Sequence, residues 1–149
     1  MKAATGQALV SAVMATADGF LRESQRLFRP LGLTGAQYNL LNVLAESDGG
    51  LSQRGISDRL VVDRSNVTGL IDRMEKAGWV KRTDDPKDRR VYRVLLTPAG
   101  RRLWEKVTPR YQAVVAQVTR ALSERRMREV VAVLRELERA AGEWTLPAD

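Results

Sequence analysis

The chain has 149 residues, of which 44% are hydrophobic and 29% charged, a balance typical of one globular domain. It contains no cysteine and no histidine, which excludes disulfides and thiol-based sensing and removes the commonest zinc ligand and general base. The net charge of +7 arises in residues 51–110, where 15 basic residues stand against 8 acidic ones. This excess favours phosphate binding, although an ordinary arginine-rich surface would show it too.

These exclusions bear on chemistry and location. We expect no enzyme, no cofactor and no metal, although a carboxylate-only metal site or a Ser, Lys or Asp mechanism stays open on composition alone. Polar residues interrupt the first 20 residues, so they lack the continuous apolar region of a signal peptide. No stretch approaches about 18 uninterrupted apolar residues, the length a membrane span needs, and we expect a cytoplasmic protein.

Apolar residues at helical spacing predict one long amphipathic helix from Val10 to Leu31, ended by Pro30 and Gly32. Thr34 is then the expected N-cap of a second helix, with Gln37 as its capping-box partner. This helix stops before Asp48.

Residues 50–52 lead to a third helix that Ser52 caps, and residues 61–62 form a tight connection. We expect Asp63 to cap a fourth helix over residues 64–77, followed by Gly78 in a left-handed conformation. Two helices joined by so short a turn predict a helix-turn-helix.

Residues 79–83 and 91–96 read as strands around a turn-rich charged tip, and together they predict a β-hairpin. Thr97 and Pro98 are typical of the start of a fifth helix, which Pro109 is expected to kink. Residues 123–141 carry a last amphipathic stripe. The fold class is therefore mainly α with a small β-hairpin wing (α+β), in one domain.

The terminal helices carry more apolar surface than a small winged-helix core can cover. A homodimer would bury this surplus by pairing the helices across a twofold axis. The alternative is that they pack against their own domain. We favour the homodimer.

A helix-turn-helix followed by a basic hairpin suits DNA: the second helix enters the major groove while the hairpin meets the backbone or the minor groove. Asn66 could pair with adenine in a bidentate manner, Arg64 could reach guanine or a phosphate, and Arg73 is better placed for phosphates. Each residue alone could equally be an ordinary exposed side chain. The candidate DNA-binding residues are Arg64, Ser65, Asn66, Thr68, Gly69, Arg73, Lys87, Asp88, Arg89 and Arg90.

At the hairpin tip, an aspartate beside two arginines is unexpected for an anion-binding surface. Asp88 could hold one guanidinium by a bidentate contact and so prepare it for a narrow minor groove. We expect Arg90 to be the inserted residue, with Arg89 as second choice. The alternative is an ordinary exposed ion pair of small energetic value.

The run RSNVTGLIDRMEKAGWVKRTDDPKDRRVYRVLLTPAG resembles the recognition helix and wing of the multiple antibiotic resistance regulator (MarR) family, and LGLTGAQYNLLNVL is similar to that family's second helix. The resemblance implies a winged helix-turn-helix over residues 34–97 and dimerisation helices over residues 1–33 and 98–149. It further implies a homodimer on a pseudo-palindromic operator in double-stranded DNA, usually repression, and often release by a small aromatic or phenolic anion.

The resemblance also implies a ligand pocket near the first, second and fifth helices. Its candidates are Phe20, Arg22, Arg26, Tyr38, Asn42 and Tyr111, although Phe20 and Tyr38 fit an ordinary core equally well. Two residues depart from the family pattern. Gly55 replaces a frequent helix-supporting glutamate, and Gly69 stands where some members place a base-reading arginine.

Two other functions fit the same fold. A protein-interaction module would expose apolar anchors at the start of the fourth helix, where this chain has polar residues. A nonspecific architectural DNA binder would insert an apolar wedge, whereas this hairpin tip is charged. Both are less consistent with the sequence than a sequence-specific transcription regulator.

Overall fold

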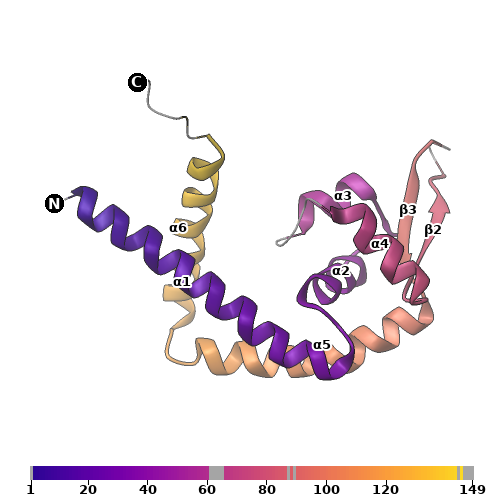
Figure 1. Cartoon of the computed structure of the whole chain (residues 1–149), viewed down its shortest axis with the longest axis horizontal. Coiled ribbons are helices and arrows are strands. Elements are labelled where there is room, and N and C mark those ends of the chain that lie inside the picture. The colour runs from indigo at the N-terminus through magenta and orange to yellow at the C-terminus, as the bar shows by residue number, and fades with distance from the viewer. Residues whose placement is uncertain (1, 61–65, 87, 89, 144, 146–149) are drawn as a thin grey trace. The chain divides into compact units, whose positions relative to one another are not determined.

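The computed structural model describes residues 2–60, 66–86, 88, 90–143 and 145. Its helices are α1 (Lys2–Phe28), η1 (Arg29–Leu31), α2 (Gly35–Ala45), α3 (Gln53–Arg59), α4 (Val67–Lys76), α5 (Pro98–Thr119) and α6 (Glu124–Glu143), and its strands are β1 (Leu51–Ser52), β2 (Val80–Asp84) and β3 (Tyr92–Leu96) (Figure 1). The chain forms two compact units, residues 1–109 and 110–149, which are described separately. The mainly helical fold with a small sheet confirms the predicted fold class.

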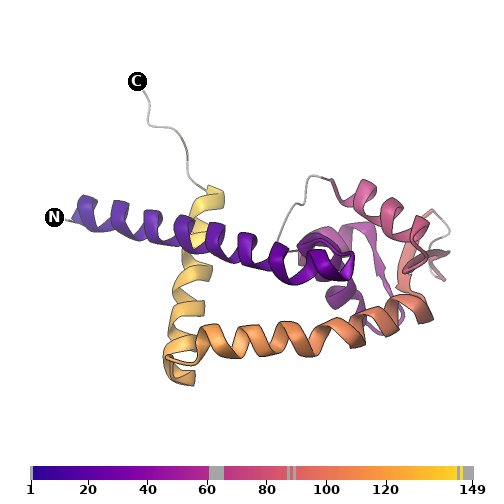
Figure 2. The same cartoon turned by 60° about the horizontal axis from the view of Figure 1, so that its bottom comes forward.

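The core of the first unit lies where α2, α3, α4 and the sheet meet (Figure 2). Helix α2 contributes Leu40 and Leu41, both fully buried, and α4 contributes Ile71 and Met74. At the end of α1, the rings of Phe28 and Tyr38 stack with their centroids 4.7 Å apart. This packing fixes α4 against its neighbours and leaves its polar side exposed.

Local capping signals are confirmed where they fall on described residues. Thr34 Oγ1 accepts a hydrogen bond from the Gln37 N–H while the Gln37 side chain accepts one from the Thr34 N–H, which forms the predicted capping box. Ser52 Oγ accepts from the Gly55 N–H at 3.1 Å. Gly78 has a φ of +74°, as its place after α4 predicts.

The start of the fourth helix differs from the prediction. Helix α4 begins at Val67, and its N-cap is Asn66, whose side chain accepts from the Gly69 N–H. The expected start at Arg64 with Asp63 as cap is therefore wrong, and residues 61–65 lie outside the described residues. Asparagine and aspartate are equally good caps, so the local pattern could not choose between positions 63 and 66.

The sheet has three antiparallel strands in the order β1-β3-β2, where the sequence predicted two. The additional strand, β1, is only two residues long and pairs Leu51 with Val94. Gly50 enables this pairing because its φ is +76° and a Cβ there would lie 2.6 Å from the Val94 carbonyl oxygen. Two residues are too short for an alternating pattern to reveal a strand.

Helix α5 begins as predicted: Thr97 Oγ1 accepts from the Gly100 N–H at 3.0 Å, and Pro98 is the first helical residue. Pro109 lies inside this helix. Helix α6 begins at Glu124 after Ser123, again as predicted. None of the described helices carries an apolar window long enough to cross a membrane.

Candidate nucleic-acid interface

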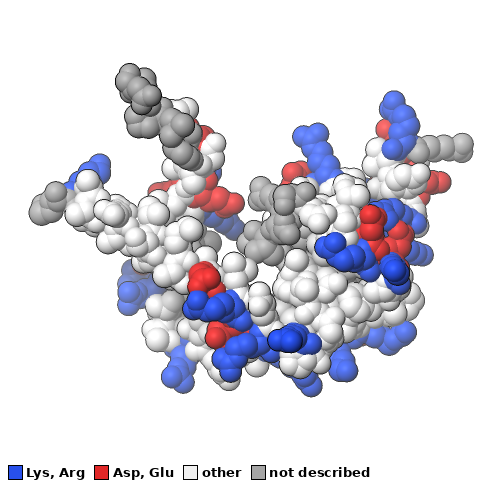
Figure 3. All heavy atoms as spheres, in the orientation of Figure 1, with Lys and Arg blue, Asp and Glu red and all other residues white. Residues whose placement is uncertain are grey.

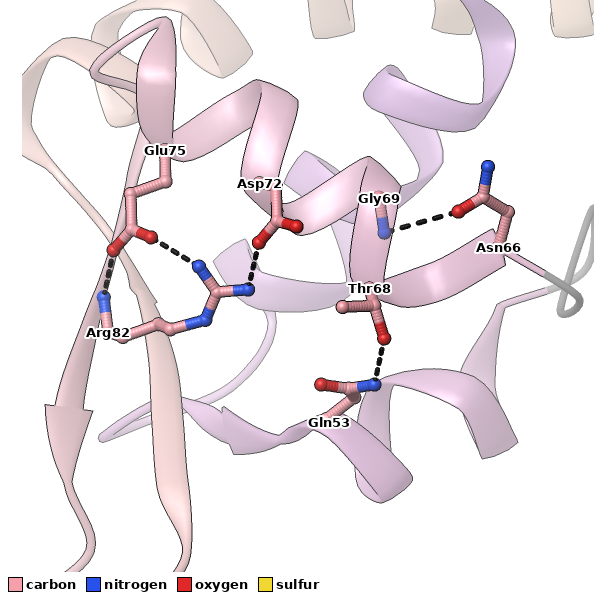
Figure 4. A network of polar contacts seen from close by, with 7 residues as sticks. All are labelled: Gln53, Asn66, Thr68, Gly69, Asp72, Glu75 and Arg82. Carbon is pink, nitrogen blue, oxygen red and sulfur yellow. Dashed lines mark hydrogen bonds and ion pairs between the residues drawn. The ribbon is translucent and has the colours of Figure 1, made fainter.

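The first turn of α4 presents short polar side chains on its exposed side (Figure 4). Four apolar residues, Val67, Leu70, Ile71 and Met74, are buried on the opposite side and set the rotation of the helix. Asn66 Oδ1 accepts the Gly69 N–H at 3.2 Å. Asn66 and Thr68 are both exposed. The polar start of the helix is thus available to a ligand.

A side-chain hydrogen bond links the two helices of the helix-turn-helix. Gln53 Nε2, in the first turn of α3, donates to Thr68 Oγ1 at 2.5 Å (Figure 4). Sequence reasoning missed Gln53, because 15 residues separate it from Thr68 and no local pattern connects them. The sequence offered one indication of this role: Gln53 is a polar residue that directly follows the Ser52 cap.

Arg82 joins the wing to α4. Its guanidinium donates to Asp72 and Glu75, which lie one turn apart on α4, and its backbone N–H donates to Glu75 Oε1 at 2.9 Å (Figure 4). The hydrogen bond to Asp72 is the largest cause that raises the pKa of Arg82 above its ordinary value, and Glu75 adds to it. Arg82 therefore fixes strand β2 to α4 and offsets part of the negative charge of the two carboxylates.

A second arginine fixes the other side of the wing. Arg93 Nε donates to Asp85 Oδ2 at 2.6 Å, and Arg93 Nη1 donates to the Gly49 carbonyl oxygen at 3.0 Å. Arg82 and Arg93 were not among the predicted site residues. Both act across long sequence separations, which single-sequence patterns do not reveal.

At the wing tip, Asp88 holds Arg90. Arg90 Nε and Nη2 donate to the two carboxylate oxygens at 3.1 and 3.2 Å, and the Arg90 N–H donates to Oδ1 at 3.0 Å. These hydrogen bonds from Arg90 lower the pKa of Asp88. The Arg90 side chain is 89% exposed, so a bidentate contact fixes a guanidinium that still faces solvent.

The remaining DNA-binding candidates are less completely placed. Arg73 is exposed on α4, and its guanidinium forms no hydrogen bond or ion pair with another described residue. Arg64, Ser65, Lys87 and Arg89 lie outside the described residues. On the face shown in Figure 3, basic side chains surround an acidic cluster beside the hairpin.

The ligand-pocket candidates separate into two groups in the first unit. On α1, Phe20 is exposed, and the guanidinium groups of Arg22 and Arg26 pair with Asp18 and Glu23. On α2, two side chains instead contact α5.

Tyr38 and Asn42 are the two α2 candidates. The Tyr38 hydroxyl donates to Thr108 Oγ1 at 3.2 Å, and this tyrosine is buried. Asn42 Oδ1 accepts from Trp104 Nε1 at 3.1 Å. The structure therefore brings Tyr38 and Asn42 to one α2–α5 contact, whereas Tyr111 belongs to the second unit.

A short three-stranded sheet whose hairpin extends beside the second helix of a helix-turn-helix defines a winged helix-turn-helix protein. The model of the MarR family matches residues 31–91. The transcriptional regulator TtmR of Methylorubrum extorquens strain PA1 is 36% identical over 142 residues, which cover 94% of this chain and 72% of TtmR.

Two solved structures extend the likeness to the whole fold. AbsC, a MarR family transcriptional regulator from Streptomyces coelicolor, has a TM-score of 0.83 at 25% identity, covering 93% of this chain and 96% of AbsC. CouR from Rhodococcus jostii RHA1, solved bound to p-coumaroyl-CoA, has a TM-score of 0.72 at 27% identity, covering 93% and 95%. The chain belongs to the MarR family and is a DNA-binding transcription regulator.

Proposed function

We propose that this regulator binds a pseudo-palindromic operator as a homodimer, with α4 in the major groove and the wing at the neighbouring minor groove. The observation that carries the proposal is the exposed polar turn of α4 beside a wing that presents a fixed arginine. Base edges are read by short polar and arginine side chains, and phosphate contacts set the register.

Each part of the proposed interface has a distinct task. Thr68 in the first turn of α4 and Asn66 at its N-cap face the bases, and Gly69 allows close approach. Ser65, which precedes the cap in the sequence, is a further candidate for base contact. Arg73 supplies positive charge on α4, and Arg64, which precedes this helix in the sequence, would add a further charge. Lys87 and Arg89 add charge at the wing. Arg90, held by Asp88, enters the minor groove with little loss of side-chain entropy.

Exposed apolar side chains support the homodimer. Helix α6 has no buried residue, although Val130, Val131 and Leu134 recur at helical spacing. The α1 side chains Leu9, Val10 and Met14 are exposed in the same way. Exposed apolar side chains that recur along each helix are typical of an interface, and a twofold partner would cover the same faces on both copies.

We further propose that operator binding represses transcription, because bound protein excludes other proteins from the same DNA. A small aromatic or phenolic ligand would release it. CouR supports this class of ligand, since it was solved with p-coumaroyl-CoA. In the first unit, Phe20, Tyr38 and Asn42 would contact the ring, and Arg22 and Arg26 its acidic group.

Fluorescence anisotropy with the DNA upstream of the protein's own gene tests operator binding. We expect the dimer to prefer this duplex over a scrambled one by about a thousandfold or more, with a steep salt dependence. Arg90→Ala should weaken binding to both duplexes, while Asn66→Ala should mainly reduce the preference. Arg102→Ala, which removes one exposed charge from α5, is the matched control. Equal affinity for both duplexes would contradict a sequence-specific operator.

The ligand is tested separately, with p-coumarate and p-coumaroyl-CoA titrated into the protein–operator complex. Release at micromolar concentration is expected, with Arg22→Ala and Arg26→Ala raising the concentration required. An affinity that stays constant across both titrations would contradict release by this ligand class.

A further inference from the structure

Gly69 separates two side chains on the exposed face of α4. A Cβ at this position would collide with Asn66 Oδ1 and would lie 3.3 Å from Arg73 Nη1. The space beside the glycine is therefore shared by the Asn66 amide and the Arg73 guanidinium. Helical side chains lean toward the N-terminus, which brings Arg73 back over Gly69 from one turn further along.

The cap fixes the polarity of the Asn66 amide. Oδ1 accepts the Gly69 N–H at 3.2 Å, and only the oxygen can do so because the amide nitrogen has no acceptor capacity. Nδ2 then points away from the helix (Figure 4). None of the described residues accepts a hydrogen bond from it. Because Oδ1 faces the helix backbone, the outward edge of the Asn66 amide presents the two N–H donors of Nδ2 to a ligand.

Arg73 has the same polarity. A guanidinium carries five N–H donors and no acceptor, and this one forms no hydrogen bond or ion pair with another described side chain. Two donor-only groups thus flank Gly69. This differs from the adenine contact expected from the sequence, because adenine pairs with an asparagine that offers both an acceptor and a donor.

We propose that Asn66 and Arg73, set apart by Gly69, form a donor-only reading surface that selects guanine in the major groove. Guanine offers two acceptors there, N7 and O6, whereas adenine offers one acceptor and one donor and cytosine only a donor. This inference rests on the proposed placement of α4 in the major groove. Gly69 determines specificity by leaving room for both donors.

Asn66→Asp tests the polarity directly. Aspartate has the same shape and caps helices as well as asparagine, so the Gly69 N–H keeps its acceptor and the fold is retained. The outward donor becomes an acceptor. At the base pair that Asn66 reads, the preference should move from guanine to cytosine, with an affinity for the original operator about tenfold lower. An unchanged melting temperature verifies the cap.

Gly69→Ala provides the complementary test, because its methyl group displaces Asn66 Oδ1 from the cap. The released amide regains an acceptor, so adenine should become acceptable at the same base pair. Gly142→Ala is the matched control, since a Cβ there meets nothing within 4 Å. This control should leave the base preference unchanged.

Binding to duplexes that carry each of the four base pairs at every operator position gives the readout. A guanine preference that moves in both variants supports the proposal. A wild-type preference that neither variant alters would overturn it and leave the proposed function intact. A wild-type protein with no preference at any position would overturn the proposed function itself.

Discussion

Asp88 and Arg90 show how a single acidic residue can serve a surface that binds an anion. The carboxylate makes three hydrogen bonds to Arg90, yet the guanidinium stays exposed. A negative charge near DNA opposes binding, so its benefit must come from holding the arginine in position. The negative charge of Asp88 should therefore lower DNA affinity, whereas its positioning of Arg90 should raise it. A substitution at Asp88 shows which of the two effects is larger.

We expect Asp88→Asn to weaken operator binding about threefold to tenfold, because Arg90 loses its bidentate partner and must be ordered by the DNA instead. Asp84→Asn is the control: it removes the same charge from an exposed wing residue whose carboxylate forms no ion pair with another described residue. Its loss of negative charge should strengthen binding slightly. Anisotropy at fixed salt measures both. If Asp88→Asn also strengthens binding, positioning by Asp88 is excluded.

The lowered pKa of Asp88 gives a prediction in pH. A carboxylate with a depressed folded-state pKa keeps its charge through the ordinary aspartate range near 3.8, so the contact with Arg90 is complete above that range. It is lost only as the pH falls through the lower folded-state value. NMR titration of the Asp88 carboxyl carbon should show this shift in the wild type. In Arg90→Ala the pKa should return toward its ordinary value, and an identical titration in both proteins would contradict the cause.

At the scale of elements, Arg82 connects the hairpin to the recognition helix. Its side chain is only 26% exposed and bridges the carboxylates of Asp72 and Glu75. Rigid attachment of the wing to α4 fixes the distance between the two groove contacts. Loss of the Arg82 bridge should therefore lower operator affinity even under conditions where the variant is fully folded.

Arg82→Ala should lower the free energy of unfolding by about 1–2 kcal/mol, since two charge-assisted hydrogen bonds are lost. Operator affinity should fall as well, measured at a temperature where the variant is fully folded. Arg82→Lys should recover little, because an ammonium group lacks the planar fork that reaches both carboxylates. Full recovery of affinity by lysine would show that the charge alone matters.

The start of α5 depends on a close approach of two backbones. A Cβ on Gly100 would lie 2.9 Å from the Trp79 carbonyl carbon and closer still to its oxygen. Gly100→Ala should therefore lower the unfolding free energy by about 1–3 kcal/mol through overpacking. In Gly6→Ala, where a Cβ meets nothing within 4 Å, stability should rise slightly. Urea unfolding of both variants measures the difference, and equal effects would contradict the close approach.

The elements that the sequence predicted are those specified by neighbouring residues. Thr34 with Gln37, Ser52 and Gly78 act within one turn of the chain, and all three signals are confirmed. Strand β1 escaped prediction because its pairing with Val94 spans more than 40 residues. The same separation hides the Arg93 contact with Gly49. Long-range contacts depend on the assembled fold, so one sequence gives no periodic signal for them.

The candidate interface divides in the same way. Residue types and charge placed the polar turn of α4 and the Asp88–Arg90 pair, both of which are local. The polarity of Asn66 was not accessible, because it depends on which residue caps α4. Two candidates, Asp63 and Asn66, fit the cap equally well by residue type. The structure distinguishes them, because α4 begins at Val67 directly after Asn66.

For the whole molecule, the unpartnered apolar faces are the main feature that one chain leaves unexplained. Val131 on α6 is 48% exposed and lines an open hollow with Met127 and Ala132. Burying such a face stabilises a protein by about 25 cal/mol for each Å² of apolar surface removed from water. A second copy of the chain would remove this exposure and place two recognition helices on one operator.

Val131→Glu tests this arrangement, because a carboxylate in a paired apolar face is strongly unfavourable. We expect the dimer to dissociate at micromolar concentration in sedimentation equilibrium, and operator affinity to fall about a hundredfold as the second half-site contact is lost. Ala140→Glu is the control, since it adds the same charge to the same helix on the side opposite to Val131 by helical spacing. It should remain dimeric. If Val131→Glu stays dimeric with unchanged affinity, α6 does not form the interface, and the exposed faces of α1 and α5 become the next candidates.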